Sequence, residues 1–511
     1  MKKYNLFKIL GIVILFTIII SYFVPGTIIS YGQVSRDSVM PVAFTDTFFN
    51  GLTSLNVFIS TVVYILSIGF FYAILGKTEK YDALINGVAR KFSRRKSLFI
   101  VLTVFVVGLL SAVTGNMYAA LFVLPFLISV IRKLGYGRGA SIAATVGATF
   151  VGSAGSLNTY YNNQILSLIM TDNLLYKIVI TLVLLLALLA FILVFNKKPE
   201  KVELSKENVS KVLPLKIIMA VLLVLVVLGF VPWSGYFGFT GFDTFLETLN
   251  SAKIANVSIF SAIFGNEIVA FGSFELHNFA LLLTFTSVVI AIIYRVKFNE
   301  VINAIATAAK KSVPYLAILL LANIVFINLY TSGVYYTFVT VFSEKINLFT
   351  STVISAVTSV FYADYSYASQ FALSGVSYTT ATQGFELAIA IIFQAIYSLV
   401  LLVSPTSVLV FFALRYTETS YKDWIKYIWK FFIIAFLTAL VILSIATKGF
   451  GLFAIIGTIL IIALVILALL NHNKKLIKEV KKETKEEVKE VKKEVKKEKS
   501  RERNYWNAMS K

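Results

Sequence analysis

The sequence predicts an all-α polytopic membrane protein with inverted repeats, two re-entrant helical hairpins and two broken helices. Three observations support this fold: a composition too apolar for water, apolar runs of membrane-spanning length, and a motif that recurs in the second half. Of the 511 residues, 58% are hydrophobic and 14% are charged, whereas soluble proteins carry about 25% charged residues. A soluble enzyme, a coiled coil and a disordered chain are therefore excluded for everything before the charged tail at 472–511.

The net charge of +21 comes from 47 Lys and Arg residues against 26 Asp and Glu residues. The basic residues stand between apolar runs, where they orient a chain in a membrane, so we expect no nucleic acid partner. The chain has no cysteine and two histidines, which excludes disulfides, thiolate nucleophiles and most zinc and haem sites. No cofactor is expected beyond a coupling Na⁺ or H⁺.

Apolar runs define the candidate spans, because a helix needs about 20 apolar residues to cross the hydrocarbon. They lie at 7–25, 54–75, 97–113, 117–131, 139–171 (broken), 174–195, 213–232, 276–294, 313–331, 347–375 (broken), 384–416 (broken), 424–446 and 450–470. This predicts about 10–12 transmembrane segments. The basic clusters between the runs mark the cytoplasmic face, which places both termini in the cytoplasm and the segment 233–275 outside.

A re-entrant hairpin is expected between two basic clusters on the same face. Residues 94–96 and 132–133 are both basic, so the chain between them must enter the membrane and return. Both arms are short for full spans, and 111–116 would form the tip. The alternative is a pair of ordinary, tightly packed spans.

The second half repeats features of the first in the opposite orientation. Residues 111–119, Ser-Ala-Val-Thr-Gly-Asn-Met-Tyr-Ala, reappear at 355–363 as Ser-Ala-Val-Thr-Ser-Val-Phe-Tyr-Ala. Each copy precedes an apolar segment with a polar interruption, at 155–159 and 404–407, and then one more span. Inverted repeats with interrupted helices at corresponding positions are typical of secondary transporters with a site near the midplane.

The predicted organisation follows from these repeats. We expect a first repeat at 1–200, a connecting helix and external segment at 201–275, a second repeat at 276–447, an extra transmembrane helix at 448–471 and a charged cytoplasmic tail at 472–511. From Lys474 onward, 15 basic and 8 acidic residues leave a charge of +7. The tail could bind anionic lipid of the bilayer electrostatically, or remain a solvated segment.

Interrupted helices leave backbone N–H and C=O groups unpaired, which is tolerated only against protein or a water-filled cavity. Helix N-termini attract carboxylates, and unwound carbonyls suit Na⁺. Hydroxyl, amide and carboxyl side chains near the tips and breaks are therefore candidates to bind a small-molecule substrate or an ion. They are Ser111, Thr114, Gly115, Asn116, Ser156, Asn158 and Thr159 in the first half, and Ser355, Thr358, Tyr362, Asp364, Ser366, Gln394, Ser404, Thr406 and Ser407 in the second.

Asp364 is the most distinctive of these residues, because an ionisable side chain at membrane depth is a functional candidate by default. It could bind a coupling cation, carry a proton or pair with an ammonium group of the substrate. If its hairpin is shallow, it is an interfacial helix cap instead. Trp424 and Trp429 are expected to be interface anchors rather than ligands.

These observations favour a secondary active transporter of a small organic anion or amino acid, driven by a cation gradient or by exchange. A Na⁺/H⁺ antiporter on the same scaffold, with Asp364 titrating, is the alternative. A membrane enzyme is the remote alternative, and we expect no enzyme because the chain has no His-x-x-x-x-His pair or Gly-rich phosphate loop. A passive channel is disfavoured, because no ring of like charge is apparent.

The stretch from Phe393 to Phe431 resembles the ion transporter superfamily. Its break Ser404-Pro-Thr-Ser407 and the following Tyr421-Lys-Asp-Trp-Ile-Lys426 are similar to the branch of C4-dicarboxylate carriers and basic amino acid antiporters. The resemblance covers about residues 5–445. It implies an elevator-like or rocking carrier, a homodimer, in a bacterial cell membrane. Its substrate would be dicarboxylate-like or arginine/ornithine-like, moved with Na⁺ or H⁺.

Two features depart from that branch. Met117 and Tyr118 stand where the amino acid antiporters are expected to carry paired glutamates near the first tip. The tyrosine-rich segment around Asp364 replaces a tip rich in glycine and serine. The substrate of the family is therefore not carried over to this chain.

Overall fold

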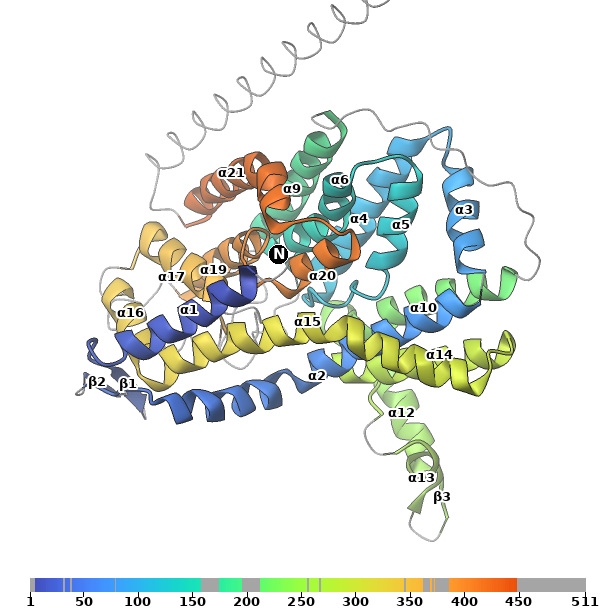
Figure 1. Cartoon of the computed structure of the whole chain (residues 1–511), viewed down its shortest axis with the longest axis horizontal. Helices are drawn as coiled ribbons and strands as arrows, with labels where there is room; N and C mark the ends of the chain where they lie inside the picture. The colour runs from blue at the N-terminus through green and yellow to red at the C-terminus, as the bar shows by residue number, and fades with distance from the viewer. Residues whose placement is uncertain are drawn as a thin grey trace, which may run out of the picture. The chain divides into compact units, whose positions relative to one another are not determined.

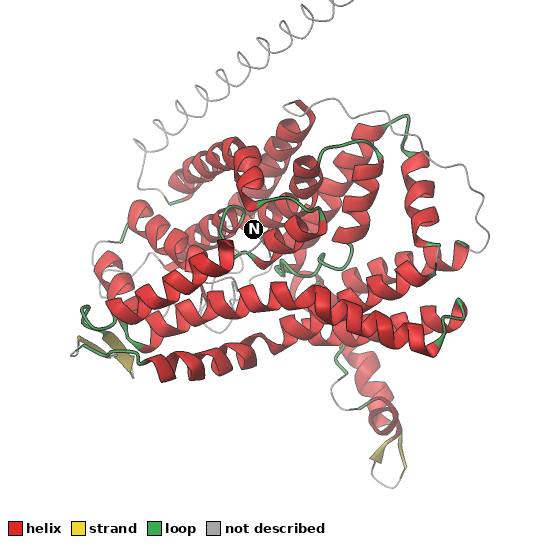
Figure 2. Ribbon diagram, viewed as in Figure 1, coloured by secondary structure: helices red, strands yellow, loops and turns green. Residues whose placement is uncertain are grey.

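Apolar helices make up most of the described structure (Figures 1 and 2). The computed structural model describes residues 5–30, 33–36, 39–78, 80–157, 174–194, 212–254, 257–265, 268–343, 346–361, 368–369, 372 and 386–447. The chain divides into two compact units, 1–454 and 455–511, and the second lies outside the described residues. The fold is that of an all-α polytopic membrane protein, as the composition predicts.

Seven of the described helices are long and apolar enough to cross a membrane. They are α2 (Phe44–Lys77), α4 (Lys96–Thr114), α9 (Leu174–Val194), α10 (Leu213–Phe230), α14 (Leu276–Ile293), α15 (Phe298–Thr331) and α21 (Tyr421–Ala446). The predicted number of 10–12 segments stays a prediction, because several candidate spans include residues outside the described ranges.

Shorter helices and two small ribbons complete the described part. The helices are α1 (Asn5–Ile20), α3 (Tyr81–Lys91), α5 (Leu124–Lys133), α6 (Arg138–Ile142), the π-helix η2 (Ala143–Gly147), α7 (Ala148–Ala154), α11 (Trp233–Phe237), α12 (Gly241–Ser251), α13 (Ile259–Phe264), α16 (Val334–Ser343), α17 (Leu348–Phe361), α19 (Glu386–Leu401) and α20 (Val408–Tyr416). The antiparallel ribbons pair β1 (Thr27–Ser30) with β2 (Gln33–Arg36), and β3 (Lys253–Ile254) with β4 (Val257–Ser258).

The two longest helices, α2 and α15, pack against each other in opposite directions. Near the start of α2, Asn50 Nδ2 donates to Oδ1 of Asn328 near the end of α15, at 2.8 Å. Further along α2, a Cβ on Gly69 would lie 3.0 Å from Oγ of Ser312, in the first half of α15. Each helix is the first long one of its half, so their antiparallel packing is the relation that an inverted repeat requires.

Helix α1 packs on α15, the long helix of the other half, and runs parallel to it. Leu10 lies in one apolar cluster with Ile318. About two to three turns further along the two helices, Asn328 Nδ2 donates to Oγ1 of Thr17 at 3.2 Å. The first helix of the chain is therefore held by a residue more than 300 positions away.

Helix α14 makes the reciprocal contact with α2, again in parallel. Tyr64 packs edge-on against Phe279 with ring centroids 6.1 Å apart, and the hydroxyls of Ser67 and Thr284 share a hydrogen bond of 3.1 Å. In each half, the helix that precedes the long helix, α1 or α14, therefore packs on the long helix of the other half. We call α1, α2, α14 and α15 the frame helices.

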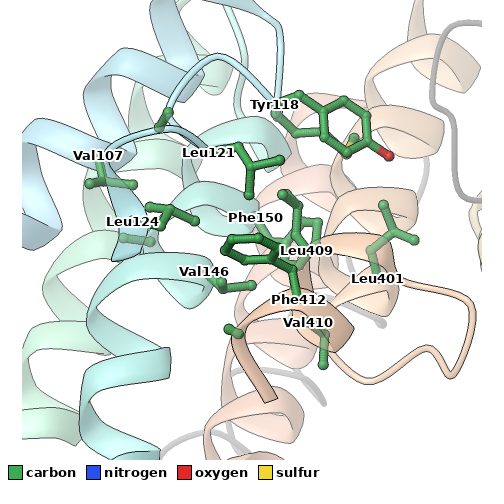
Figure 3. Packing of buried hydrophobic residues seen from close by; sticks show 14 of the residues in the cluster. Val107, Tyr118, Leu121, Leu124, Val146, Phe150, Leu401, Leu409, Val410 and Phe412 are labelled. Atoms are coloured by element: carbon green, nitrogen blue, oxygen red, sulfur yellow. The ribbon is translucent and has the colours of Figure 1, made fainter. Parts of the chain in front are cut away.

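A second group of helices packs beside this frame. We call α4, α7, α9, α17, α19 and α21 the inner helices: α4 packs on α7 and α9, α17 packs on α19, α7 packs on α19, and α9 packs on α21. Their apolar side chains belong to one continuous core, in which Val107 and Phe150 of the first half lie with Leu401 and Leu409 of the second (Figure 3). The inner helices therefore join both halves.

Several element boundaries differ from the predicted ones. Helices α2 and α15 begin well before the predicted spans 54–75 and 313–331, and α15 includes Lys310 and Lys311, which were expected in a cytoplasmic loop. Helices α3 and α16 were not predicted at all. Hydropathy marks only the apolar stretch of a helix, so polar extensions and short amphipathic helices escape it.

The ends of α7 and α19 and the hydrogen bonds at the breaks define the equivalence between the halves more clearly than the repeated motif does. Helices α7 and α19 end at 154 and 401, and the carbonyl groups bonded by the breaks belong to Ala112 and Ser359. Both pairs are 247 residues apart, whereas the copies of the motif are 244 residues apart. The motif copies are therefore offset by three residues from the structural equivalence. The predicted repeat boundaries themselves stay predictions.

Candidate functional site

The first inner break, residues 155–157, follows the end of α7 and is bonded to the last turn of α4. Leu157 N–H donates to the carbonyl oxygen of Ala112 at 2.8 Å, and Ser156 Oγ donates to the same oxygen at 3.1 Å. Next to Ala112 in α4, the hydroxyl of Ser111 shares a hydrogen bond of 2.7 Å with the hydroxyl of Ser153 in α7. The break is thus fixed to the arm of the first hairpin, and the chain beyond 157 is outside the described residues.

The second inner break, residues 402–407, separates α19 from α20 and makes the equivalent contact with α17. Ser404 Oγ donates to the carbonyl oxygen of Ser359 at 3.2 Å, and Thr406 Oγ1 donates to that of Val360 at 2.9 Å. Ala112 and Ser359 are 247 residues apart, the same separation as between the ends of α7 and α19. In both halves, side-chain hydroxyls of the break therefore donate to carbonyl oxygens of the neighbouring hairpin arm.

Gln394 of α19 connects the second half to the first break. Its side chain is 3% exposed, and its Nε2 donates to the carbonyl oxygens of Ser153 and Ser156, at 3.2 and 2.9 Å. The Ser153 carbonyl oxygen also accepts the N–H of Ser156, at 3.2 Å, so the Gln394 amide adds donors from α19 to the turn that follows α7. The first break consequently depends on a residue from the opposite half.

The final helix of each half begins beside the break. In the second half, the Trp424 indole N–H donates to the carbonyl oxygen of Leu402 at 2.9 Å, and the Tyr421 hydroxyl donates to that of Val403. Trp424 is fully buried, so its expected role as an interface anchor is wrong. The interruption of the helix leaves carbonyls that need a donor inside the protein, and this tryptophan provides one.

Replacing Trp424 by phenylalanine should destabilise the folded protein by about 1–3 kcal/mol, because the Leu402 carbonyl would stay buried without its donor. The matched control is Trp429→Phe in the same helix, where the side chain is 46% exposed and we expect no measurable change. The two variants are heated in detergent, and gel filtration measures the fraction of protein that has not aggregated at each temperature. Equal melting temperatures would contradict the role given to Trp424.

Ser407 is the residue of the second break with an unused hydrogen-bonding group. It is 2% exposed and stands at the N-cap of α20, yet its Oγ has no hydrogen-bond partner. A buried hydroxyl without a partner costs free energy. Ser407 and the N–H groups of the first turn of α20 can therefore bind an acceptor such as a carboxylate oxygen.

The predicted first tip is displaced along the chain. Ser111 and Thr114 lie in the last turn of α4, Gly115 ends that helix with a φ of 67°, and the turns that follow extend to residue 123. A left-handed backbone favours glycine at this position. The predicted second arm, 117–131, is helical only from Leu124. Its start was misplaced because apolar turns and apolar helices look alike in hydropathy.

Several candidate side chains bond locally. The Thr114 hydroxyl donates to the carbonyl oxygen of Leu110, and Asn116 Oδ1 accepts the N–H of Tyr118. In α17, the hydroxyls of Ser355 and Thr358 donate to carbonyl oxygens one turn earlier. These residues shape the ends of the hairpin arms.

Five predicted site residues lie outside the described residues. They are Asn158, Thr159, Tyr362, Asp364 and Ser366. Within the described ranges, no group of three His, Asp or Glu residues could hold a metal ion.

One residue near the first break was missed by the sequence analysis. Lys177, in the fourth position of α9, is 3% exposed. It stands inside the predicted span 174–195, and a basic residue within an apolar run is the signal that could have identified it.

The fold and the site define an all-α polytopic membrane protein of two inverted halves, in which α7 and α19 end at corresponding positions and the residues that follow are bonded to α4 and α17. No family model and no curated protein matches the sequence. Among solved structures, the chain is similar to the YdaH transporter of Alcanivorax borkumensis, with 14% identity, a TM-score of 0.43, and coverage of 87% of this chain and 98% of that one.

A second similar structure is that of MtrF of Neisseria gonorrhoeae, which represents a class of antimetabolite efflux pumps. The identity is 13%, the TM-score is 0.40, and the likeness covers 87% of this chain and 95% of that chain. Because both likenesses are distant, no property of either protein is transferred to this chain. Membership of the C4-dicarboxylate and basic amino acid branch stays a prediction.

Proposed function

We propose that the protein is a secondary active transporter of a small organic anion or amino acid, driven by a cation gradient or by exchange. The observation that carries the proposal is the pair of inner breaks, one in each inverted half, joined by Gln394. Interrupted helices at corresponding positions of inverted repeats are the pattern on which such carriers build a site.

The chemistry of the second break favours a substrate with a carboxylate. Ser407 offers a buried hydroxyl without a partner at the N-terminus of α20, where the helix dipole favours negative charge. The substrate would reach this break as a dicarboxylate-like anion or through the carboxylate of an amino acid. Its coupling ion, Na⁺ or H⁺, belongs to the same proposal.

The packing also supports a way to move the site. Helix α2 packs on α14 and α15, and α1 packs on α15, whereas the inner helices pack mainly on one another. Helices α3 and α16 link the two groups at equivalent points of the two halves. We propose that the inner helices shift relative to the frame during transport, in a homodimer whose basic tail lies against anionic lipid.

Counterflow in proteoliposomes tests the proposal. Vesicles loaded with unlabelled succinate, glutamate, arginine or ornithine are diluted into a trace of the same labelled compound. A carrier accumulates label only when its substrate is inside, and protein-free liposomes provide the control. If no compound of such a panel exchanges, with or without a Na⁺ or H⁺ gradient, the proposal is wrong.

Asp364→Asn should abolish the dependence of uptake on the cation gradient, because a neutral amide can neither bind Na⁺ as a carboxylate nor carry a proton. Exchange at equal ion concentrations on both sides should persist. A pH-jump assay on the same vesicles separates the Na⁺/H⁺ antiporter alternative, in which proton movement needs no organic substrate. Full gradient-driven uptake by the variant would remove Asp364 from the coupling site.

A further inference from the structure

Lys177 is the only charged side chain among the buried residues that the structure describes. It occupies the fourth position of α9, and α9 packs on α4, α7 and α21, all of them inner helices. With an exposed fraction of 3%, this lysine does not lie along the lipid-facing side of its helix. An isolated ammonium group in such surroundings is unfavourable unless an anion compensates its charge.

The first turns of α9 are in direct contact with the first inner break. A Cβ added to Gly155 would lie 2.3 Å from the carbonyl oxygen of Lys177 and 2.3 Å from Oγ1 of Thr181. The Thr181 hydroxyl donates to the carbonyl oxygen of Gly155 at 3.0 Å. The backbone of Lys177 is therefore packed against the break itself, and the neighbouring threonine already satisfies the break's carbonyl.

Comparison with the equivalent residue of the second half shows that Lys177 is not needed as a donor to the first break. Helices α7 and α19 end at 154 and 401, which are 247 residues apart, and Ala112 and Ser359, which bond the two breaks, show the same separation. In this register Lys177 corresponds to Trp424, and Gly155 corresponds to Leu402. Trp424 donates to the Leu402 carbonyl, whereas the equivalent carbonyl in the first half is taken by Thr181. Lys177 thus occupies the position from which Trp424 donates in the other half, but the carbonyl oxygen of Gly155 that it would bond already accepts from Thr181.

No carboxylate compensates this charge among the inner-helix side chains that the structure describes. The acidic residue of α21, Asp423, is exposed and accepts a hydrogen bond from Ser420 at the start of that helix. In the part of the chain that the structure describes, the single ion pair within 4.0 Å joins His277 and Glu275, at the start of α14. The side chains that hydrogen-bond at the first break are uncharged: Ser156, Thr181 and Gln394.

We infer that Lys177 binds a carboxylate group of the transported substrate at the first inner break. The inference rests on the proposed function and adds a specificity-determining residue to it. The ammonium group offers three donors and a full positive charge, and a carboxylate beside it would remove the cost of burying that charge unpaired. Lys177 and Ser407 would then present anion-binding groups from the two halves.

The test compares Lys177→Met with Lys177→Arg and with Lys216→Met. Lys216 is the matched control, because it also occupies the fourth position of its helix, α10, but is exposed. Binding of succinate, glutamate and putrescine is measured by thermal stabilisation in detergent, and counterflow of the same three probes is measured in proteoliposomes. Putrescine has no carboxylate and reports on cation transport.

We expect Lys177→Met to weaken carboxylate binding about 10- to 100-fold, the range for losing a hydrogen bond to a charged group. Lys177→Arg keeps the charge and should retain much of the affinity, and Lys216→Met should match the wild type. The arginine variant keeps the test valid if the methionine variant does not fold.

Three results would overturn the inference. Unchanged carboxylate affinity in Lys177→Met, or a loss in Lys177→Arg as large as in Lys177→Met, would show that the positive charge is not part of the site. Lower stability of Lys177→Met with unchanged carboxylate binding would indicate an internal salt bridge instead. Unchanged counterflow of succinate or glutamate by Lys177→Met would contradict the inference while the carrier proposal stands, whereas counterflow of putrescine alone, or of no probe, by the wild type would contradict both.

Discussion

Gly152→Ala is expected to prevent the inner helices from packing and to abolish transport. A Cβ at this position would lie 2.0 Å from the carbonyl oxygen of Gly108 and 2.8 Å from its carbonyl carbon, so the clash is with backbone that no rotamer change can relieve. Overpacking of a core costs about 1–3 kcal/mol when side chains can move, and here α4 and α7 must separate. We expect the melting temperature in detergent to fall and counterflow to disappear.

Gly87→Ala is the matched control. Gly87 lies within α3, is exposed, and has no heavy atom within 4 Å of an added Cβ. Alanine in place of glycine inside a helix favours the folded state by roughly 0.5–1 kcal/mol, so this variant should melt at the same temperature as the wild type or slightly higher. If Gly152→Ala behaved like Gly87→Ala, the close crossing of α4 and α7 would be wrong.

Gln394→Leu should uncouple the two halves at the first break. The substitution keeps the bulk of the side chain and removes the hydrogen bonds to the carbonyl oxygens of Ser153 and Ser156. Each lost hydrogen bond costs about 0.5–1.5 kcal/mol. Gln394→Glu should be worse, because its carboxylate would face those two oxygens. We expect lower melting temperatures for both variants, with glutamate below leucine, and loss of counterflow.

A hydroxyl that bonds only within its own helix provides the comparison for Gln394. Thr438 of α21 donates to the carbonyl oxygen of Ile434 in the same helix, so Thr438→Val should change stability by less than about 0.5 kcal/mol, as surface-type substitutions do. A Gln394→Leu protein that exchanges substrate at the wild-type rate would show that contact between the halves is not needed for transport.

The sequence contains enough information to predict the helical class, because hydropathy is a local property of each apolar run. It also identified both inner breaks, since glycine, proline and hydroxyl residues interrupt apolar runs there. What it could not provide is the partner of each residue. Gln394 was grouped with the second half, and only the three-dimensional packing shows that its amide bonds to the first.

The errors have a common physical origin. Trp424 was interpreted from the usual preference of tryptophan for membrane interfaces, but a carbonyl freed by the neighbouring break recruits its N–H. Lys177 was overlooked because the run around it is long and apolar. Both residues occupy the position facing a break, and this equivalence becomes visible only when helix ends, rather than the repeated motif, define the register.

The exchange of α1 and α14 between the halves bears on how the protein is made. Asn328 accepts from Asn50 and donates to Thr17 and Thr47, at sequence separations of 278 to 311 residues. At about 5–20 residues per second, the ribosome needs roughly a quarter of a minute to one minute to reach Asn328 after Asn50. The first two membrane helices must therefore wait in the bilayer, their polar side chains still lacking these partners, while α4 to α9 are already being inserted.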